Sequence, residues 1–220
     1  MTFRALDLAS APQSDALARR LVVEGGIDVL VNNAGYGVFG AVEEVAADEV
    51  ARQFEVNLLG PLRLTRLLLP ALRHRGGRII WIGSLAGRQS LAFQAHYSAT
   101  KAGVAAVSDA LRVELRPVGV QVTCVEPGDI ATGFTDARRH VGAADSAYAA
   151  RAARSLAAVE RAERAAPAPE SVARVVERLV ARRWLPSRVP AGRLGRTTCL
   201  FLRLVPHAVG QWAVSRIYET

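Results

Sequence analysis

The stretch that decides the fold is Ala95-His96-Tyr97-Ser98-Ala99-Thr100-Lys101-Ala102-Gly103. Apolar residues follow it at helical spacing through Leu115, which predicts a long helix that begins in this stretch. Tyr97 and Lys101 are four residues apart, so they share one face of that helix and can act on the same small volume.

Lys101 is also the single lysine of the chain, because the other 27 of the 28 Lys and Arg residues are arginines. Arginine carries a bulky, permanently charged fork, whereas lysine carries a compact ammonium on a flexible stem. Chemistry that needs a point charge below a phenol would explain why this one lysine is kept. The alternative is an arginine-rich coding bias with one accidental survivor.

Length and composition indicate one globular domain. The chain has 220 residues, half of them apolar, and a mean hydropathy of +0.16. No leader with a cleavage site follows Met1, and no uncharged apolar stretch reaches about 18 residues, so we expect a cytoplasmic protein. Cys124 and Cys199 are too few and too far apart for a disulfide framework or a metal knuckle, and we expect no metal.

The net charge of +8 is unevenly distributed. Residues 1–137 hold 13 cations and 14 anions, whereas residues 138–220 hold 15 cations and 6 anions. Nucleic-acid binding is one use for such a surplus. No helix-turn-helix, zinc or RNA-binding signature accompanies it, so we expect no nucleic acid and favour a solvated basic helical face.

Strand and helix patterns alternate along the first 125 residues. A helix is expected from Ser10 and Pro12 to Gly25, and a second from about Ala47 to Leu72 with a start or kink at Pro61. The predicted strands are Phe3–Leu8, Ile27–Val31, Arg78–Ile82 and Val120–Val125. This alternation predicts an α/β fold with a doubly wound parallel sheet.

Three polar or turn residues follow directly after predicted strands: Asn33, Ser84 and Pro127. In open α/β sheets, ligands bind beyond the carboxyl ends of the strands. We therefore expect a site there.

The segment Gly35-Tyr36-Gly37-Val38-Phe39-Gly40 fits the pattern G-x-G-x-x-G, with Glu55 twenty residues after Gly35. Alone it would be read as a dinucleotide fingerprint. The third glycine is not clearly inside a helix, however, so we disfavour a diphosphate loop at this position without excluding it.

These residues together resemble the short-chain dehydrogenases/reductases. The resemblance covers about 125 residues. It rests on five motifs in order: Leu6-Asp7-Leu8, Asn32-Asn33-Ala34-Gly35, Asn57 with Ser84, Tyr97-x-x-x-Lys101, and Pro127-Gly128-Asp129-Ile130-Ala131-Thr132. It implies a Rossmann-like fold and an oxidoreductase that uses NAD or NADP.

The resemblance also assigns roles. Tyr97 would be the general acid or base, with a pKa lowered from its ordinary value near 10 by the Lys101 ammonium. Lys101 would hold the nicotinamide ribose, Ser84 would stabilise charge on the reacting oxygen, and Asn57 would order a water that links Lys101 to solvent. The resemblance implies that Asp7 and Asn33 contact the adenosine side of the cofactor and that Pro127, Gly128, Ile130 and Thr132 lie around the carboxamide. It also implies that Ala34 binds the cofactor.

Each of these residues has a structural alternative. Ser84 could cap a helix, Asn57 could face solvent, and Asn32 and Asn33 could bond their own loop backbone. Tyr97 could anchor the edge of the core through its hydroxyl. The motifs taken jointly favour the catalytic interpretation.

The chain also departs from the family pattern. The family begins with a strand followed by T-G-x-x-x-G-I-G, whose glycines let the backbone approach the cofactor diphosphate. No such segment precedes Asp7, so we expect a Rossmann-like sheet that lacks its first two strands and helices. We expect no measurable binding of NAD or NADP by residues 1–220. The competing hypothesis is a non-catalytic remnant that associates with intact relatives.

The C-terminal part predicts a substrate region within the single domain 1–220. Residues 134–166 are rich in Ala and Arg and are expected to form a helical lid, Glu170 opens a further helix, and Ser187–Pro190 is the best candidate for the last strand. The tail 187–220 contains an apolar run at 199–205, flanked by Arg193 and Arg196. It resembles tails of steroid- and retinol-type members, which suggests a lipophilic alcohol or ketone.

Two kinds of contact surface are expected. The basic and apolar tail is a candidate for peripheral contact with an anionic membrane. The helices at 47–72 and 97–116 are candidates for a homo-oligomer interface.

Overall fold

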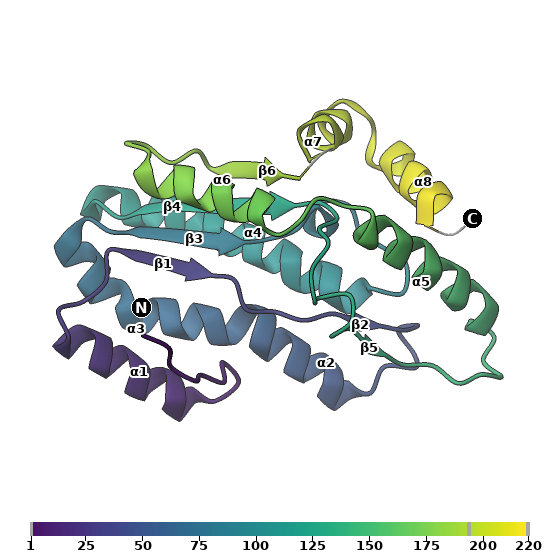
Figure 1. Ribbon diagram of the computed structural model, residues 1–220, viewed down its shortest axis with the longest axis horizontal. Coiled ribbons are helices and arrows are strands. Elements are labelled where there is room, and N and C mark those ends of the chain that lie inside the picture. The colour runs from purple at the N-terminus through teal and green to yellow at the C-terminus, as the bar shows by residue number, and fades with distance from the viewer. Residues whose placement is uncertain (1, 193–194, 219–220) are drawn as a thin grey trace.

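A four-stranded parallel sheet forms the centre of the protein in a computed structural model that describes residues 2–192 and 195–218 (Figure 1). Its spatial order is β1 (Val29–Asn32), β3 (Arg78–Ile82), β4 (Gln121–Pro127) and β6 (Arg188–Ala191). Neighbouring strands pair in parallel, with Val31 opposite Ile80 and Trp81 opposite Cys124. The predicted α/β fold is confirmed, and β6 confirms the predicted last strand.

Helices cover both faces of this sheet (Figure 1). On one face lie α1 (Ala11–Val23), α3 (Gly60–Arg75) and α4 (Ala95–Leu115), and on the other lies α6 (Glu170–Ala181). The remaining helical elements are α2 (Ala47–Phe54), η1 (Glu55–Leu59), η2 (Leu85–Gly87), η3 (Arg116–Val118), α5 (Ala149–Arg164), α7 (Gly195–Leu204) and α8 (His207–Tyr218). The layers therefore follow the doubly wound pattern.

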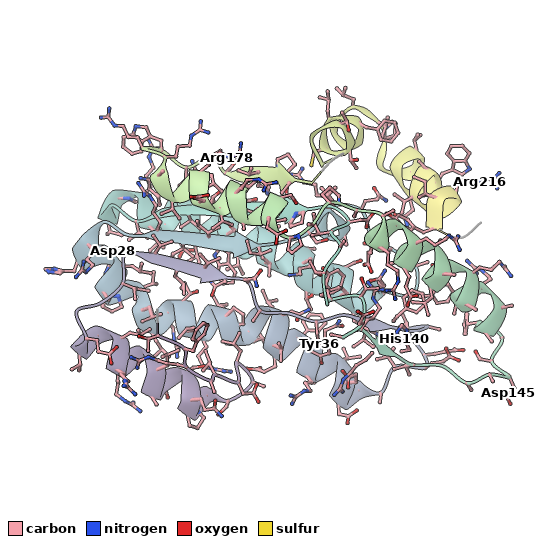
Figure 2. The ribbon with its side chains drawn as sticks, viewed as in Figure 1. Asp28, Tyr36, His140, Asp145, Arg178 and Arg216 are labelled. Atoms are coloured by element: carbon pink, nitrogen blue, oxygen red, sulfur yellow. The ribbon has the colours of Figure 1, made fainter. Side chains whose placement is uncertain are left out.

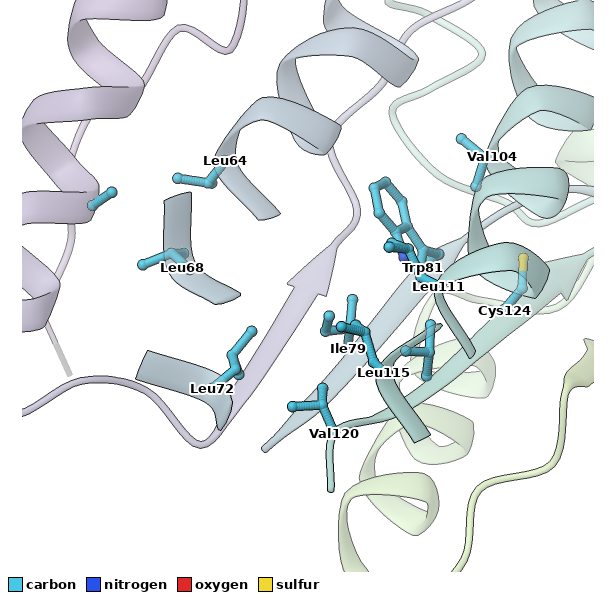
Figure 3. Packing of buried hydrophobic residues seen from close by; sticks show 12 residues of the cluster. Leu64, Leu68, Leu72, Ile79, Trp81, Val104, Leu111, Leu115, Val120 and Cys124 are labelled. Atoms are coloured by element: carbon cyan, nitrogen blue, oxygen red, sulfur yellow. The ribbon is translucent and has the colours of Figure 1, made fainter. Parts of the chain in front are cut away.

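The larger core lies between β3, β4 and the helices α3 and α4 (Figure 3). Leu68, Leu72 and Ile79 are fully buried there, and Trp81 is 1% exposed. Their contribution is large because burial of one such side chain is worth about 1.5–3 kcal/mol. This packing fixes α4 against β3 and β4.

The predicted strand at Phe3–Leu8 is wrong. The segment runs beside the helices, where its backbone groups bond elsewhere: Asp7 N–H donates to Gln13 Oε1 at 2.8 Å, and the Leu8 carbonyl accepts from Arg63 at 3.3 Å. A Cβ built on Gly60 would lie 2.3 Å from the Leu8 carbonyl oxygen, so the segment packs directly against the start of α3. Among the described residues, β1 consequently pairs on one side only, and Val31 is 40% exposed.

The helix expected from Ala47 to Leu72 exists, but it contains one wide turn. The segment Glu55–Leu59 is a π-helix that joins α2 to α3 directly before Pro61. Pro61 has no N–H to donate, which favours a break in the regular ladder at this point. Such wide turns are frequent at functional sites, and this one carries Asn57.

The expected helical lid at 134–166 is only partly helical. Helix α5 begins at Ala149, whereas the preceding segment contains a two-residue strand, β5 (Arg139–His140), which pairs in parallel with β2 (Val38–Phe39). Gly142 follows with a φ of +144°, a conformation that ends regular structure. In the tail, Arg193 lies outside the described residues, as does the side chain of Arg196.

The part of the chain that the structure describes contains no helix long and apolar enough to cross a bilayer.

Candidate active site

A cavity of about 1300 Å³ opens beyond the carboxyl ends of the parallel strands. The strand arrows point to the side of the molecule where α5 and α8 lie (Figure 1). Predicted site residues that line the cavity are Asn33, Ser84, Tyr97, Lys101, Pro127, Gly128, Ile130 and Thr132. Asp7 and Ala34 are not among the lining residues, and Asp7 instead accepts a hydrogen bond from Ala9 N–H at 2.9 Å in the turn before α1.

Lys101 reaches from α4 to the sheet. Its Nζ donates a hydrogen bond of 2.9 Å to the carbonyl of Ile82, and the residue is 6% exposed. Burial disfavours the charged form and lowers the pKa of Lys101 to about 8. An ammonium has three donors, and the bond to Ile82 uses one of them.

The structure contradicts the expected direction of the Tyr97 shift. Burial raises the pKa of Tyr97 to about 12, against a smaller lowering by its hydrogen bond with Ser84. The Lys101 ammonium is 5.8 Å from the centre of the Tyr97 ring. In this arrangement the loss of water around the phenol outweighs the nearby charge, so the phenol is protonated at neutral pH.

Ser84 combines the structural role and the site role. It caps η2, where its Oγ accepts from Ala86 N–H at 3.1 Å. The Ser84 side chain also acts on the Tyr97 phenol, whose pKa it lowers. The capping bond fixes Ser84 at the end of β3, so its hydroxyl is held beside the phenol.

Asn57 does not face solvent, because it is 2% exposed. Its Oδ1 accepts from Tyr36 N–H at 3.0 Å, while its Nδ2 donates to the Tyr36 carbonyl at 2.9 Å and to Thr100 Oγ1 at 3.2 Å. Asn57 thereby joins the loop after β1 to α4. A Cβ on Gly35 would lie 3.1 Å from Asn57 Oδ1 and 3.7 Å from Lys101 Nζ, so these groups are close together.

The three glycines of Gly35-x-Gly37-x-x-Gly40 are explained by packing. A Cβ on Gly37 would lie 3.1 Å from the Phe134 ring, and one on Gly40 would lie 2.7 Å from the Val141 carbonyl. The segment forms β2 rather than a helix start, and it runs beside the returning chain at Arg139 and His140 (Figure 2). Its glycines accommodate that chain and Asn57.

Sequence reasoning did not find several residues at the cavity. Phe134 lies with its ring centre 5.6 Å from that of Tyr97, and Tyr218 donates a hydrogen bond of 3.0 Å to Asp129 Oδ2. Glu163, from α5, also lines the cavity. None of these carries a local motif, although Asp129 lies inside the quoted Pro127–Thr132 segment.

The described residues that line the cavity fit the nicotinamide half of a nicotinamide dinucleotide better than its diphosphate. Two Lys101 donors beside the Tyr97 hydroxyl fit the ribose next to the nicotinamide. Among the described lining residues, however, Lys101 is the single cation, and the carboxylates are Asp129, Glu163 and Glu177. That part of the wall does not provide the positive contacts that suit a diphosphate.

Comparison with known proteins identifies the family. Residues 1–141 match the family described as short chain dehydrogenase. The chain is 37% identical over 174 residues to a 3-ketodihydrosphingosine reductase of Bacteroides thetaiotaomicron, covering 78% of this chain and 65% of that protein. It is 30% identical over 208 residues to an uncharacterized oxidoreductase of Bacillus subtilis, YusZ, covering 92% of this chain and 74% of that protein.

Solved structures agree with this assignment. A short-chain dehydrogenase from Streptomyces avermitilis superposes with a TM-score of 0.78 at 32% identity, over 98% of this chain and 78% of that one. The chain therefore belongs to the short-chain dehydrogenase family. It spans slightly less than two thirds of the length of the Bacteroides reductase.

Proposed function

We propose that the protein transfers a hydride between a nicotinamide cofactor and an alcohol or carbonyl substrate, with Tyr97 exchanging the proton. One observation carries the proposal: Ser84, Tyr97 and Lys101 line a single cavity beyond the carboxyl ends of the strands. The match to the short-chain dehydrogenase family supports the same reaction class.

The side chains divide the work between them. Ser84 donates to the reacting oxygen and stabilises charge that develops there. Tyr97, protonated at neutral pH, donates its proton to that oxygen when a carbonyl is reduced, which leaves a phenolate. In the reverse direction the phenolate form of Tyr97 accepts the proton of the alcohol. Lys101 holds the neighbouring ribose, and Asn57 keeps the loop after β1 fixed to α4.

Bound NAD or NADP would supply the hydride. The residues that would hold its nicotinamide half are Tyr97, Lys101, Pro127, Gly128, Ile130 and Thr132, with Asn33 nearby. A related short chain dehydrogenase/reductase from Burkholderia phymatum was solved in complex with NAD, at a TM-score of 0.75 and 26% identity. This relative supports the cofactor class and leaves the choice between NAD and NADP to experiment.

The function is tested with the chain of residues 1–220. Calorimetric titration with NADH and NADPH measures binding of the cofactor. Turnover is measured as the loss of NADH or NADPH absorbance after a lipophilic ketone is added. With turnover present, Tyr97→Phe should abolish it and leave the circular dichroism spectrum unchanged, because only the hydroxyl is removed. Turnover by Tyr97→Phe at the wild-type rate would contradict the proposal.

The second candidate function is association without catalysis. It is favoured by the acidic cavity wall described above and by β1, which pairs on one side only among the described residues. Exposed strand edges pair with other chains. Under this hypothesis neither dinucleotide binds to residues 1–220, and sedimentation velocity shows self-association. Tight binding of either dinucleotide would exclude it.

The substrate that the cavity fits best is a lipophilic alcohol or ketone. Apolar side chains from several elements line it: Leu85, Leu91, Val159, Val172, Val176, Val214 and Ile217. The segment 134–166 contributes Phe134, Ala137 and Val159 and would serve as the substrate lid. Replacement of Val214 by Asp should raise KM for a long-chain ketone more than for a short one.

The tail is proposed to contact an anionic membrane. Its helices α7 and α8 expose Leu204, Trp212 and Ile217, which are 75%, 64% and 64% exposed. The tail 187–220 carries five arginines and one glutamate, a balance that favours anionic lipid. Flotation with anionic vesicles should show binding that weakens as salt rises. Trp212→Ala should reduce it, whereas Trp184→Ala, at a 67% exposed tryptophan outside the tail, should not.

A homo-oligomer interface on η1 and α4 is also proposed. Leu59 and Val113 are 46% and 73% exposed on these two elements. Val113→Glu should lower the sedimentation coefficient if this face is buried in a dimer.

A further inference from the structure

A buried ion pair lies at the wall of the cavity, between the loop after β4 and helix α5, and its carboxylate partner Glu163 lines the cavity. The side chains of Arg138 and Glu163 are 0% and 12% exposed, and Arg138 Nη2 bonds Glu163 Oε1. The second carboxylate oxygen accepts a hydrogen bond of 2.7 Å from Thr135 Oγ1. Within the described residues, Nε and Nη1 of Arg138 have no acceptor. An uncompensated buried charge is unfavourable, so the Glu163 carboxylate stabilises the Arg138 guanidinium in its buried position.

Phe134 lies between this guanidinium and Tyr97. The Arg138 Cζ is 5.5 Å from the centre of the Phe134 ring, which is 5.6 Å from the centre of the Tyr97 ring at an interplanar angle of 54°. Lys101 Nζ lies 5.8 Å from the Tyr97 ring centre. Two aromatic rings thus connect two buried cations, at distances where cation–ring and ring–ring contacts are attractive.

The position of Phe134 is fixed from two further directions. Its N–H donates a hydrogen bond of 3.1 Å to Thr132 Oγ1. On the other side, a Cβ on Gly37 would lie 3.1 Å from Phe134 Cζ, so the loop after β1 packs directly against the ring. The ring therefore has little room to move away from Tyr97.

We propose that Phe134, held by the Arg138–Glu163 pair, positions the Tyr97 ring for proton transfer. The proposal rests on the function proposed above for Tyr97, and it makes Phe134, Arg138 and Glu163 positioning residues. The charged groups that face Tyr97 are Lys101 on α4, Asp129 after β4, and Arg138 with Glu163. Of these, Glu163 and Asp129 raise the pKa of Tyr97 and Arg138 lowers it, so the pair is close enough to act on the phenol.

The test observes Tyr97 directly. The chain contains four tyrosines, so carbon-13 labelling of the tyrosine ring gives four signals, and Tyr97→Phe identifies the one that belongs to Tyr97. Phe134→Leu keeps an apolar side chain of similar size but opens the packing, and Glu163→Gln removes the carboxylate. Both should move the Tyr97 titration midpoint to lower pH by about half a unit or more, through hydration in the first and loss of a negative neighbour in the second.

The matched control is the ion pair of Arg164 with Asp136. It joins the same two segments at 3.2 Å, but its side chains are 61% and 71% exposed. Asp136→Asn should leave the Tyr97 midpoint unchanged. Where turnover is measurable, Phe134→Leu should lower kcat between about tenfold and a hundredfold, with a smaller change in KM, because misplacement of a reacting group acts on the chemical step.

Identical Tyr97 midpoints in wild type, Phe134→Leu and Glu163→Gln would overturn the proposal, and so would an equal shift in Asp136→Asn. Phe134→Leu keeps the test decisive if Glu163→Gln fails to fold. The titration needs no turnover, so a chain without activity would contradict the proposed function while the midpoints still decide the positioning role.

Discussion

The ammonium of Lys101 donates a hydrogen bond of 2.9 Å to the carbonyl of Ile82, the last residue of β3. This bond ties the helix that carries Tyr97 to the carboxyl end of a central strand. Close packing supports it, since a Cβ on Gly87 would meet the Lys101 backbone at 2.7 Å. Tyr97 and Lys101 therefore have a fixed relation to the cavity that follows the strands.

Lys101→Arg should leave less than about a tenth of the wild-type kcat/KM. This corresponds to a loss of more than about 1.4 kcal/mol of transition-state stabilisation. The guanidinium retains the charge, but its planar fork does not fit a position that is 6% exposed and lies 3.7 Å from a Cβ built on Gly35. Steady-state kinetics measure the effect. Arg66→Lys, on the exposed face of α3, is the control for this type of exchange and should be neutral. A Lys101→Arg enzyme with more than a tenth of the rate would refute the interpretation of the single lysine.

The stability of the protein relative to Lys101→Met should rise with pH. Burial lowers the pKa of Lys101 from its ordinary 10.5 to about 8, so between these values the unfolded chain binds more protons than the folded one. The cost of the buried charge is fully present below pH 8 and disappears as the pH approaches 10.5. Urea unfolding of both proteins is measured at several pH values. Relative to Lys101→Met, the free energy of unfolding of the wild type should rise by at most about 1.4 kcal/mol per pH unit. Parallel curves for the two proteins would contradict a depressed pKa.

Asn57→Ala should reduce the free energy of unfolding by about 1–3 kcal/mol. The Tyr36 carbonyl would keep its hydrogen bond from Gln53 Nε2 at 3.2 Å, but the Tyr36 N–H would lose its acceptor. Asn32→Ala, at the last residue of β1, is the matched control, because it removes a single side-chain bond, of 2.9 Å, to Thr65 Oγ1. Urea denaturation should show the smaller loss for Asn32→Ala, and the reverse order would refute the bridging role of Asn57.

Gly40→Ala should destabilise the protein by about 1–3 kcal/mol, the range for an overpacked position. The new Cβ would lie 2.7 Å from the Val141 carbonyl, which belongs to the backbone and cannot swing aside. Gly133→Ala has open space around its Cβ and should change stability by less than about 0.5 kcal/mol. Thermal melts of both variants compare the two positions. Equal stability of both variants would remove the packing explanation for the third glycine.

The sequence by itself located three central strands and the helix that carries Tyr97 and Lys101. Helical spacing placed Tyr97 and Lys101 on one face, and continuous apolar runs located three strands whose ends carry Asn33, Ser84 and Pro127. These features were readable because each depends on neighbours within a few residues. The parallel sheet then brings the strand ends to one edge, as its topology requires.

Only the tertiary structure decided features that depend on distant partners. Phe3–Leu8 has a strand-like pattern, yet its backbone bonds to Gln13 and Arg63 instead of a sheet. The ion pair of Arg138 with Glu163 joins residues 25 apart that share no motif. The direction of the Tyr97 pKa shift depended on burial, which no spacing reports. Local periodicity fixes which face a side chain occupies, whereas the water and charges around that face come from segments that folding brings together.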